Sequence, residues 1–376
     1  MKCIHCGNDA NYKDRQDRKC PSCHTKFAFE PKAGDKITDM AFQSAIQRVS
    51  GDGKLRWSRE FLYYEIARYF LRKKRANLAW VLLIIPLLFL CAFLALVRAP
   101  ASIAFAIPTA LLTGWFVRRR WLRPVFLDFP RQEFDSMFSN WVSAHGSPKG
   151  LIVRKERADK PALESDIEHY SFDRAVICDR ESTVDVLIAN NFHFENNCAI
   201  LSIDGYPSGP FETVRTMLKR NPRLQVFALH DATPAGCTIA VTLANDPQWF
   251  KDQVVVIDVG LRPNLTRPFR GLFLRSHTPV APSKIISASE ANWLSQFALE
   301  LAAIRPEQIL RRLFKAINRA NSSSKDDDER EIDIDLDFDS GDDGGNPASG
   351  STHIVVDQDS FAADAADSDG GADSFG

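Results

Sequence analysis

The sequence predicts a multidomain protein whose largest unit is an α/β domain with a parallel β-sheet. Three observations predict this organisation. Four cysteines lie within the first 23 residues, two long uncharged runs lie between residues 78 and 117, and short apolar runs alternate with helix-like stretches from residue 173 onward. The predicted units are a cysteine-rich segment at 1–30, a helical module at 36–75, a hydrophobic hairpin at 78–117, a helix and linker at 130–172, the α/β domain at 173–320 and a disordered acidic tail at 321–376.

The charge of the chain is divided between its body and its tail. The formal net charge of the 376 residues is −1. Residues 326–376 hold 17 acidic residues and one basic residue and therefore carry −16, whereas residues 1–325 carry +15. Because 45% of the residues are hydrophobic, the chain can bury a substantial core, and disorder throughout is excluded. This division of charge does not fit a small soluble enzyme of ordinary composition.

The N-terminal cysteines form two Cys-x-x-Cys pairs, Cys3 with Cys6 and Cys20 with Cys23. The 13 residues between the pairs are typical of a zinc ribbon. Each pair forms a turn that directs two thiolates to one point, and Zn²⁺ takes four such ligands in a tetrahedron. We expect a structural zinc ion that supplies most of the folding energy of this short segment and leaves no coordination position for catalysis. Disulfides or a redox pair are the alternatives.

The helical module at 36–75 is predicted to contain two helices. The first begins near Asp39 and ends at the turn of residues 50–53, and Ser58 is placed to cap the second, which is basic. Such a pair fits a helix-turn-helix or winged-helix module. Aromatic and aliphatic residues recur at helical spacing along the second helix, which predicts a core-facing stripe.

Two uncharged runs, Leu78–Val97 and Ala101–Val117, predict a transmembrane hairpin. Basic clusters at 72–75 and 118–120 flank the hairpin, and the positive-inside rule then places both termini in the cytoplasm. Neither run contains Asp, Glu, Lys, Arg or His, so we expect an anchor without a transport role and a multi-pass protein of the cytoplasmic membrane. A buried helical hairpin in a soluble protein is the alternative.

The α/β domain is predicted from apolar runs that suit buried parallel strands, at 175–178, 199–203, 225–229 and 254–259. The helices are predicted between these runs and after the sheet, at about 182–191, 210–220, 235–244, 289–304 and 306–317. In a parallel sheet, the polar residues that follow the strands line one edge, where binding sites form. These residues lie at 179–181, 204–207 and 230–236.

The order of four strings, VICDRES, AILSIDGYP, LQVFALHDATPAG and VVIDVGLRP, resembles the toprim domain of the topoisomerase VI A subunit and its relatives, the meiotic double-strand-break transesterases. In that family a strand-end glutamate, a Gly-Tyr-Pro strand end and an Asp-x-Asp-Pro-x-Gly turn occur in this order, and the first position is Asp179 here. The resemblance covers about 110 residues. The family also carries a nucleophilic tyrosine on an upstream winged-helix domain, and SREFLYY at 58–64 makes Tyr64 the candidate.

The resemblance implies a Mg²⁺ site at the strand ends, with Asp179, Glu181 and Asp231 as candidate ligands. Mg²⁺ prefers several carboxylate oxygens, and it would stabilise charge at a phosphodiester. The third family position is Thr233 here, which removes one carboxylate. We therefore expect a degenerate toprim-like domain that binds without turnover. The alternative is a Mg²⁺-dependent DNA transesterase or nuclease that uses Asp179, Asp231 and Tyr64.

The tail is predicted to be disordered, because its hydrophobicity is low and its net charge is high. It could become ordered as an interaction motif on a basic partner, act as a solubilising tail, or mask the basic body of its own chain.

The combined prediction is a membrane-anchored binding or scaffold protein. A protein partner would dock through the tail or the zinc ribbon, and nucleic acid is a candidate ligand of the toprim-like domain. A membrane sensor or assembly factor that binds anionic lipid is a further alternative. The sequence indicates no small-molecule substrate.

Overall fold

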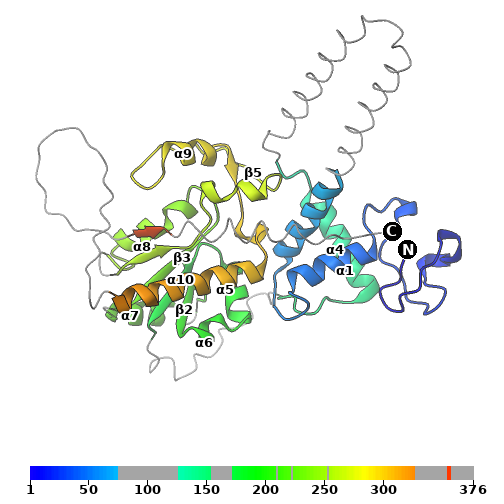
Figure 1. Ribbon diagram of the computed structural model, residues 1–376, viewed down its shortest axis with the longest axis horizontal. Coiled ribbons are helices and arrows are strands. Elements are labelled where there is room, and N and C mark those ends of the chain that lie inside the picture. Colours follow the sequence, from blue (N-terminus) through cyan, green and yellow to red (C-terminus); the bar gives the residue numbers. More distant parts are fainter. Residues whose placement is uncertain are drawn as a thin grey trace, which may run out of the picture.

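The computed structural model describes residues 1–74, 126–153, 172–208, 211–221, 223–251, 254–326 and 354–356. The helices α1 (Asp39–Val49) and α4 (Arg131–His145) lie between the N-terminal segment and the sheet of the α/β domain (Figure 1). One hydrophobic core runs from Phe29 and Phe42 in the N-terminal part to Phe227 in the sheet. The helical module and the α/β domain are therefore packed together.

A parallel sheet forms the centre of the α/β domain. Its strands follow the order β2-β1-β3-β4-β7, and β1 pairs with β2 on one side and β3 on the other. Cys178 at the end of β1 aligns with Ser202 on β2 and Leu229 on β3, so the carboxyl ends of these strands meet at one edge. The strands are β1 Arg174–Cys178, β2 Cys198–Ser202, β3 Gln225–Leu229, β4 Val256–Asp258 and β7 Ile354–Val356.

Helices cover both faces of the sheet, which explains why its strands are apolar on both faces. Alternate strand residues point to opposite faces, so Val176 packs toward α5, α6 and α10, whereas Ile177 packs toward α7 and α8. Figure 1 shows α10 and α5 on the same side of the sheet. The helices are α5 Glu181–Ala189, α6 Phe192–Glu195, α7 Phe211–Arg220, α8 Ile239–Asn245 and α10 Pro306–Asp326.

A small subdomain lies between β4 and α10. It contains β5 (Leu274–Arg275), which pairs antiparallel with β6 (Phe297–Ala298), and α9 (Ala288–Leu294). Ser287 and Glu290 form a capping box at the start of α9. The predicted helix at 289–304 is thus wrong beyond α9. The remaining short elements are 3-10 helices at Tyr12–Asp14, Gln16–Arg18, Pro31–Ala33, Gly236–Thr238, Pro263–Leu265, Arg267–Phe269 and Leu301–Ala303.

The helical module consists of α1, a helix that covers residues 59–74, and α4. Thr38 caps α1 by accepting a hydrogen bond from Ala41 N at 3.3 Å. Phe42 stacks on Trp141 of α4, with ring centroids 4.8 Å apart. In the described part of this module, β-pairing is limited to a single bridge between Trp57 and Leu151, so no paired strands of a wing are described.

The membrane predictions need correction. In the parts of the chain that the structure describes, no helix is both long and apolar enough to cross a membrane. The longest of these helices, α10, has 21 residues, but it carries charged side chains along its length. The predicted hairpin at 78–117 lies outside the described residues. A multi-pass membrane protein with a two-helix hairpin is therefore not supported.

Two parts of the acidic tail differ from the predicted disorder. Helix α10 continues to Asp326, beyond the predicted domain end at residue 320. Strand β7 pairs in parallel with β4 and aligns Ile354 with Val256. The intervening residues 327–353 lie outside the described residues. The tail thus returns to the body at the β4 edge of the sheet.

Candidate functional site

The four N-terminal cysteines converge on one point. Their Sγ atoms all lie within 4.8 Å of one another. The Sγ atoms of Cys3 and Cys23 are 3.6 Å apart, as are those of Cys6 and Cys20. A tetrahedral ion with metal–sulfur bonds of about 2.3 Å would separate its ligands by about 3.8 Å. The geometry and the thiolate chemistry fit, so this cluster could hold a metal ion.

Two equivalent turns build the cluster. Gly7 N donates to Cys3 O at 2.9 Å in the first turn, and His24 N donates to Cys20 O at 2.9 Å in the second. Gly7 has φ +71°, and His24 occupies the same position with φ +57°. A left-handed backbone is strained for histidine but not for glycine. The pKa of Cys23 is lowered to about 6 by the Thr25 hydroxyl and then by the Thr25 backbone N–H, both of which favour the thiolate.

A buried carboxylate joins the ribbon to the helices. Asp39, at the start of α1, accepts hydrogen bonds from Ala28 N at 3.0 Å and Phe29 N at 2.9 Å. The same carboxylate lies 2.7 Å from Nε2 of His145 at the end of α4. The polypeptide leaving the ribbon is therefore fixed to both helices, and the cysteine cluster has a defined position on the module.

A second cluster lies at the carboxyl edge of the sheet, where Asp179 follows β1 and Asp231 follows β3. Asp231 N donates to Asp179 Oδ2 at 2.7 Å. The other oxygen, Asp179 Oδ1, is buried and has no hydrogen-bond partner in the described part of the chain. Asp231 Oδ1 accepts from Leu301 N at 2.6 Å, and its Oδ2 accepts from Arg180 Nε at 2.5 Å. Three of the four aspartate oxygens are therefore engaged by the protein.

Arg180 links this pair to a third carboxylate. Its Nη2 lies 3.2 Å from Glu300 Oε1, while its Nε binds Asp231. Glu300 Oε2 accepts from Arg131 Nη2 at 3.0 Å and from the hydroxyl of Tyr64 at 2.9 Å. A continuous set of contacts therefore runs from the β1 strand end to the helix at 59–74. We call Asp179, Arg180, Asp231 and Glu300 the acidic edge cluster.

Burial shifts the ionisation of these groups. Burial, and then the neighbouring charge of Asp179, raise the pKa of Asp231 to about 7. Burial likewise raises the pKa of Asp179. Burial, followed by the charge of Glu300, raises the pKa of Tyr64 well above its ordinary value. The phenol of Tyr64 is therefore held in its protonated form at neutral pH.

Behind the acidic edge lies His230, a buried histidine from the predicted strand-end string at 230–236. Both ring nitrogens of His230 face acceptors, with Nδ1 2.7 Å from Asp231 O and Nε2 2.9 Å from Asp258 Oδ1. Burial opposes its charge, but Asp258 raises the pKa of His230. A Cβ atom at Gly260 would lie 2.2 Å from the His230 ring, so only glycine permits this approach. The contact of its Nδ1 with Asp231 O fixes the backbone of Asp231 and thus the geometry of the edge.

The structure brings together only some of the predicted site residues. Asp179 and Asp231 meet at the sheet edge, and Tyr64 reaches them through Glu300. Within the described residues, the four cysteines are the one group of three or more His, Cys, Asp or Glu whose ligand atoms converge as a metal site would require. Asp179, Glu181 and Asp231 form no such group.

Thr233 has a local structural role in the turn after β3. Its hydroxyl accepts a hydrogen bond from Gly236 N at 3.0 Å. The sequence placed Arg180 among the strand-end residues at 179–181 but assigned it no role, and it did not identify Glu300. Arg180 lies between Asp179 and Glu181 in the predicted strand-end string. A basic residue between two acidic ones could have indicated an ion pair at this edge. Glu300 belongs to no motif, and only the tertiary fold reveals its role.

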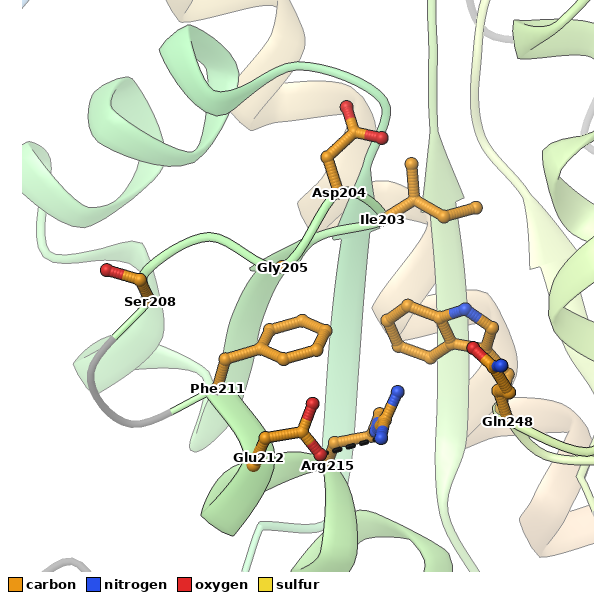
Figure 2. A pocket seen from close by; sticks show the side chains of 9 residues that line it. Ile203, Asp204, Gly205, Ser208, Phe211, Glu212, Arg215 and Gln248 are labelled. Carbon is orange, nitrogen blue, oxygen red and sulfur yellow. Dashed lines mark hydrogen bonds and ion pairs between the residues drawn. The ribbon is translucent and has the colours of Figure 1, made fainter.

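A separate cavity of 390 Å³ lies beyond the end of β2. Figure 2 shows Phe211 facing the cavity, with Glu212 and Arg215 along one side. Arg215 pairs with Glu212 at 2.6 Å and lies over the Phe211 ring at 5.4 Å. The cavity contains none of the residues of the acidic edge cluster. It is lined by Ile203, Asp204, Gly205, Ser208, Phe211, Glu212, Arg215, Gln248 and Trp249.

Comparison with protein-family models, curated proteins and solved structures gave no match for this chain.

Proposed function

We propose that the protein is a zinc-ribbon binding or scaffold protein whose toprim-like domain serves as a rigid module without turnover. The observation that carries this proposal is the position of Arg180. Its guanidinium group lies between Asp231 and Glu300, at 2.5 and 3.2 Å. An internal cation thus neutralises the carboxylates that a divalent ion would otherwise need.

The engagement of the aspartate oxygens supports the same proposal. Mg²⁺ binds through several carboxylate oxygens and waters in a near-octahedral shell. Both oxygens of Asp231 are held, by Arg180 and by Leu301 N, and Asp179 Oδ2 is held by Asp231 N. Asp179 Oδ1 is the one oxygen of this aspartate pair without a hydrogen-bond partner among the described residues, so the pair offers fewer free ligand atoms than the predicted magnesium site would use.

The surroundings of Tyr64 argue against its use as a nucleophile. A phosphodiester would have to reach its hydroxyl, but Tyr64 is 1% exposed. The hydroxyl donates its hydrogen to Glu300, and the raised pKa disfavours the phenolate. These features favour a role for Tyr64 in joining the helical module to the α/β domain.

The zinc ribbon supplies the recognition part of the proposal. A Cys₄ site of this geometry suits Zn²⁺, which would bind all four thiolates and fix the two turns. The ribbon is anchored to the helical module through Asp39, and the module is anchored to the α/β domain through Glu300. A ligand bound at the ribbon would therefore be held in a fixed orientation to the sheet. A protein partner or nucleic acid is the proposed ligand.

Removal of Arg180 tests the proposal. We expect that Mg²⁺ or Mn²⁺ does not change the melting temperature of the wild-type protein, whereas both ions stabilise Arg180→Ala. Arg59→Ala is the control, because Arg59 pairs with Asp135 at the surface and does not contact the acidic edge cluster. Mg²⁺-dependent nicking of DNA by the wild-type protein that is lost in Asp231→Ala would overturn the proposal in favour of a transesterase or nuclease.

A further inference from the structure

Away from the acidic edge cluster, three arginine side chains share the buried carboxylate of Glu65. Arg48 in α1 donates to it from Nε at 2.7 Å, and Arg68 donates from Nη1 at 3.0 Å. Arg305, which precedes α10, donates from Nε and Nη2 at 3.3 and 3.2 Å. The Glu65 side chain is 2% exposed, whereas those of the three arginines are 19–30% exposed. The anion of this cluster is inside, and its cations reach the surface.

The cluster has more positive charge than pairing requires. The two hydrogen bonds from Arg305 already form the bidentate arrangement that satisfies a carboxylate. In the described part of the chain, Glu65 is the one carboxylate with which the three arginines form ion pairs. Burial opposes the ionisation of Glu65, yet the three guanidinium groups lower its pKa to about 2. Two positive charges therefore remain uncompensated.

This surplus has a cost, because guanidinium groups that contact one carboxylate also repel one another. Burial lowers the pKa of Arg68, and the charges of neighbouring arginines lower it further, whereas the charge of Glu65 raises it. A junction between two domains needs only one such pair. An additional anion at the outer side of the cluster would relieve the repulsion.

Unused donors are available for such an anion. Nη1 and Nη2 of Arg48 and Nη1 of Arg305 make no hydrogen bond to any described residue. A nitrogen without a hydrogen bond to the protein is either buried or in contact with solvent, and none of these three atoms is buried. They are therefore accessible to solvent. Glu65 meanwhile restrains the Nε side of both arginines. The donors are therefore preorganised before any ligand binds.

We propose that Arg48 and Arg305, positioned by Glu65, form a binding site for a phosphate-type oxyanion at the junction of the helical module and the α/β domain. Arginine forks match the oxygen geometry of phosphate, and the surplus charge favours an anion. Free phosphate and the phosphodiester of a nucleic acid share this chemistry. The proposal is independent of the proposed function, because none of these residues belongs to the acidic edge cluster.

Phosphate titration of the full-length protein tests the site. We expect phosphate, at constant ionic strength against chloride, to raise the melting temperature, and Arg48→Gln to weaken phosphate binding about tenfold, as the loss of one charge-assisted contact predicts. Two arginines remain on Glu65 in this variant, so the fold should persist. Arg311→Gln is the control, because Arg311 pairs with Glu307 on the surface of α10. Equal phosphate affinity in Arg48→Gln and wild type, or equal stabilisation by chloride, would overturn the proposal.

A second measurement separates the two sources of the anion. Binding of a labelled single-stranded oligonucleotide is followed by fluorescence anisotropy as a function of salt concentration. If the phosphodiester binds here, Arg48→Gln should weaken binding and reduce the salt slope by about one. Arg305→Lys keeps the positive charge but loses the paired donors of the guanidinium group. It should weaken the binding of phosphate and of the oligonucleotide less than Arg48→Gln does. Phosphate binding that depends on Arg48 without oligonucleotide binding would assign the site to a small anion.

Discussion

The hydroxyl of Tyr64 donates a hydrogen bond of 2.9 Å to Glu300, and both residues are buried. This contact crosses the junction between the helical module and the α/β domain. The next residue of the same helix, Glu65, binds Arg305, which lies five positions beyond Glu300. Two adjacent side chains therefore attach one helix to one segment of the α/β domain. The junction consists of charged and hydrogen-bonded groups surrounded by the shared apolar core.

Tyr64→Phe should destabilise the protein without changing ligand binding. The substitution removes one buried hydrogen bond to a charged group, which we expect to lower the free energy of unfolding by about 1.5–3 kcal/mol. Urea denaturation measures this loss. Tyr12→Phe serves as a control, because Tyr12 is 46% exposed. If Tyr64 were a nucleophile, its replacement would in addition abolish a covalent adduct with DNA.

Asp179→Asn should change how stability depends on pH. An acid whose pKa is raised on folding binds more protons in the native state, so stability is greatest at low pH and falls as pH rises from about 4. For Asp231 this fall continues to about pH 7, its pKa in the native protein. Removing the Asp179 charge removes the electrostatic repulsion that disfavours the ionised form of Asp231. We therefore expect the variant to be more stable than wild type at pH 8 by about 1–2 kcal/mol and similar in stability at pH 5.

Thermal unfolding between pH 5 and pH 8 measures this difference. Asp204→Asn is the comparison, since Asp204 follows β2 at the same sheet edge but lies at the separate cavity. A variant that loses stability equally at both pH values would show that Asp179 acts through its hydrogen bond to Asp231 N, with no contribution from its charge.

The strands and the cysteine cluster could be predicted because local residues determine them. The apolar runs at 175–178 and 225–229 match β1 and β3, and the Cys-x-x-Cys spacing directs the sulfurs together within short turns. The run at 254–259 was too long, because only Val256–Asp258 has strand partners. Apolar content alone does not reveal where pairing stops.

The acidic edge could be predicted only in part, because its members come from distant segments. The positions of Asp179 and Asp231 follow from the parallel sheet, but the position of Glu300 depends on how the chain returns after α9. Leu299 exchanges two backbone hydrogen bonds with Ala232, at 2.9 and 3.1 Å. This pairing replaces the helix predicted at 289–304 and brings Leu301 N to Asp231. Tertiary hydrogen bonding thus overrides helical propensity in this segment.

His24→Gly should stabilise the second turn of the cysteine cluster. His24 has φ +57°, whereas glycine adopts this backbone without steric cost. Because glycine also gains freedom in the unfolded chain, we expect a net gain of at most about 1 kcal/mol, seen as tighter binding of Zn²⁺ in competition with a chelator. Gly7→Ala, at the equivalent position of the first turn, should have the opposite effect. Weaker Zn²⁺ binding by His24→Gly would indicate that the imidazole itself supports the site.

Removal of the tail should strengthen anion binding at Arg48 and Arg305. Residues 326–376 carry −16, and β7 holds part of this tail on the body through its pairing with β4. A chain that ends at residue 325 should bind phosphate several-fold more tightly at low ionic strength, and the difference should vanish near 0.5 M salt, where the Debye length falls to about 4 Å. Substituting asparagine for Asp333, Asp335 and Asp337 preserves the length of the tail and the β7 residues, so it isolates the effect of charge. An intermediate gain in this variant would attribute the masking to charge, whereas an unchanged affinity in both chains would contradict any masking of the arginines by the tail.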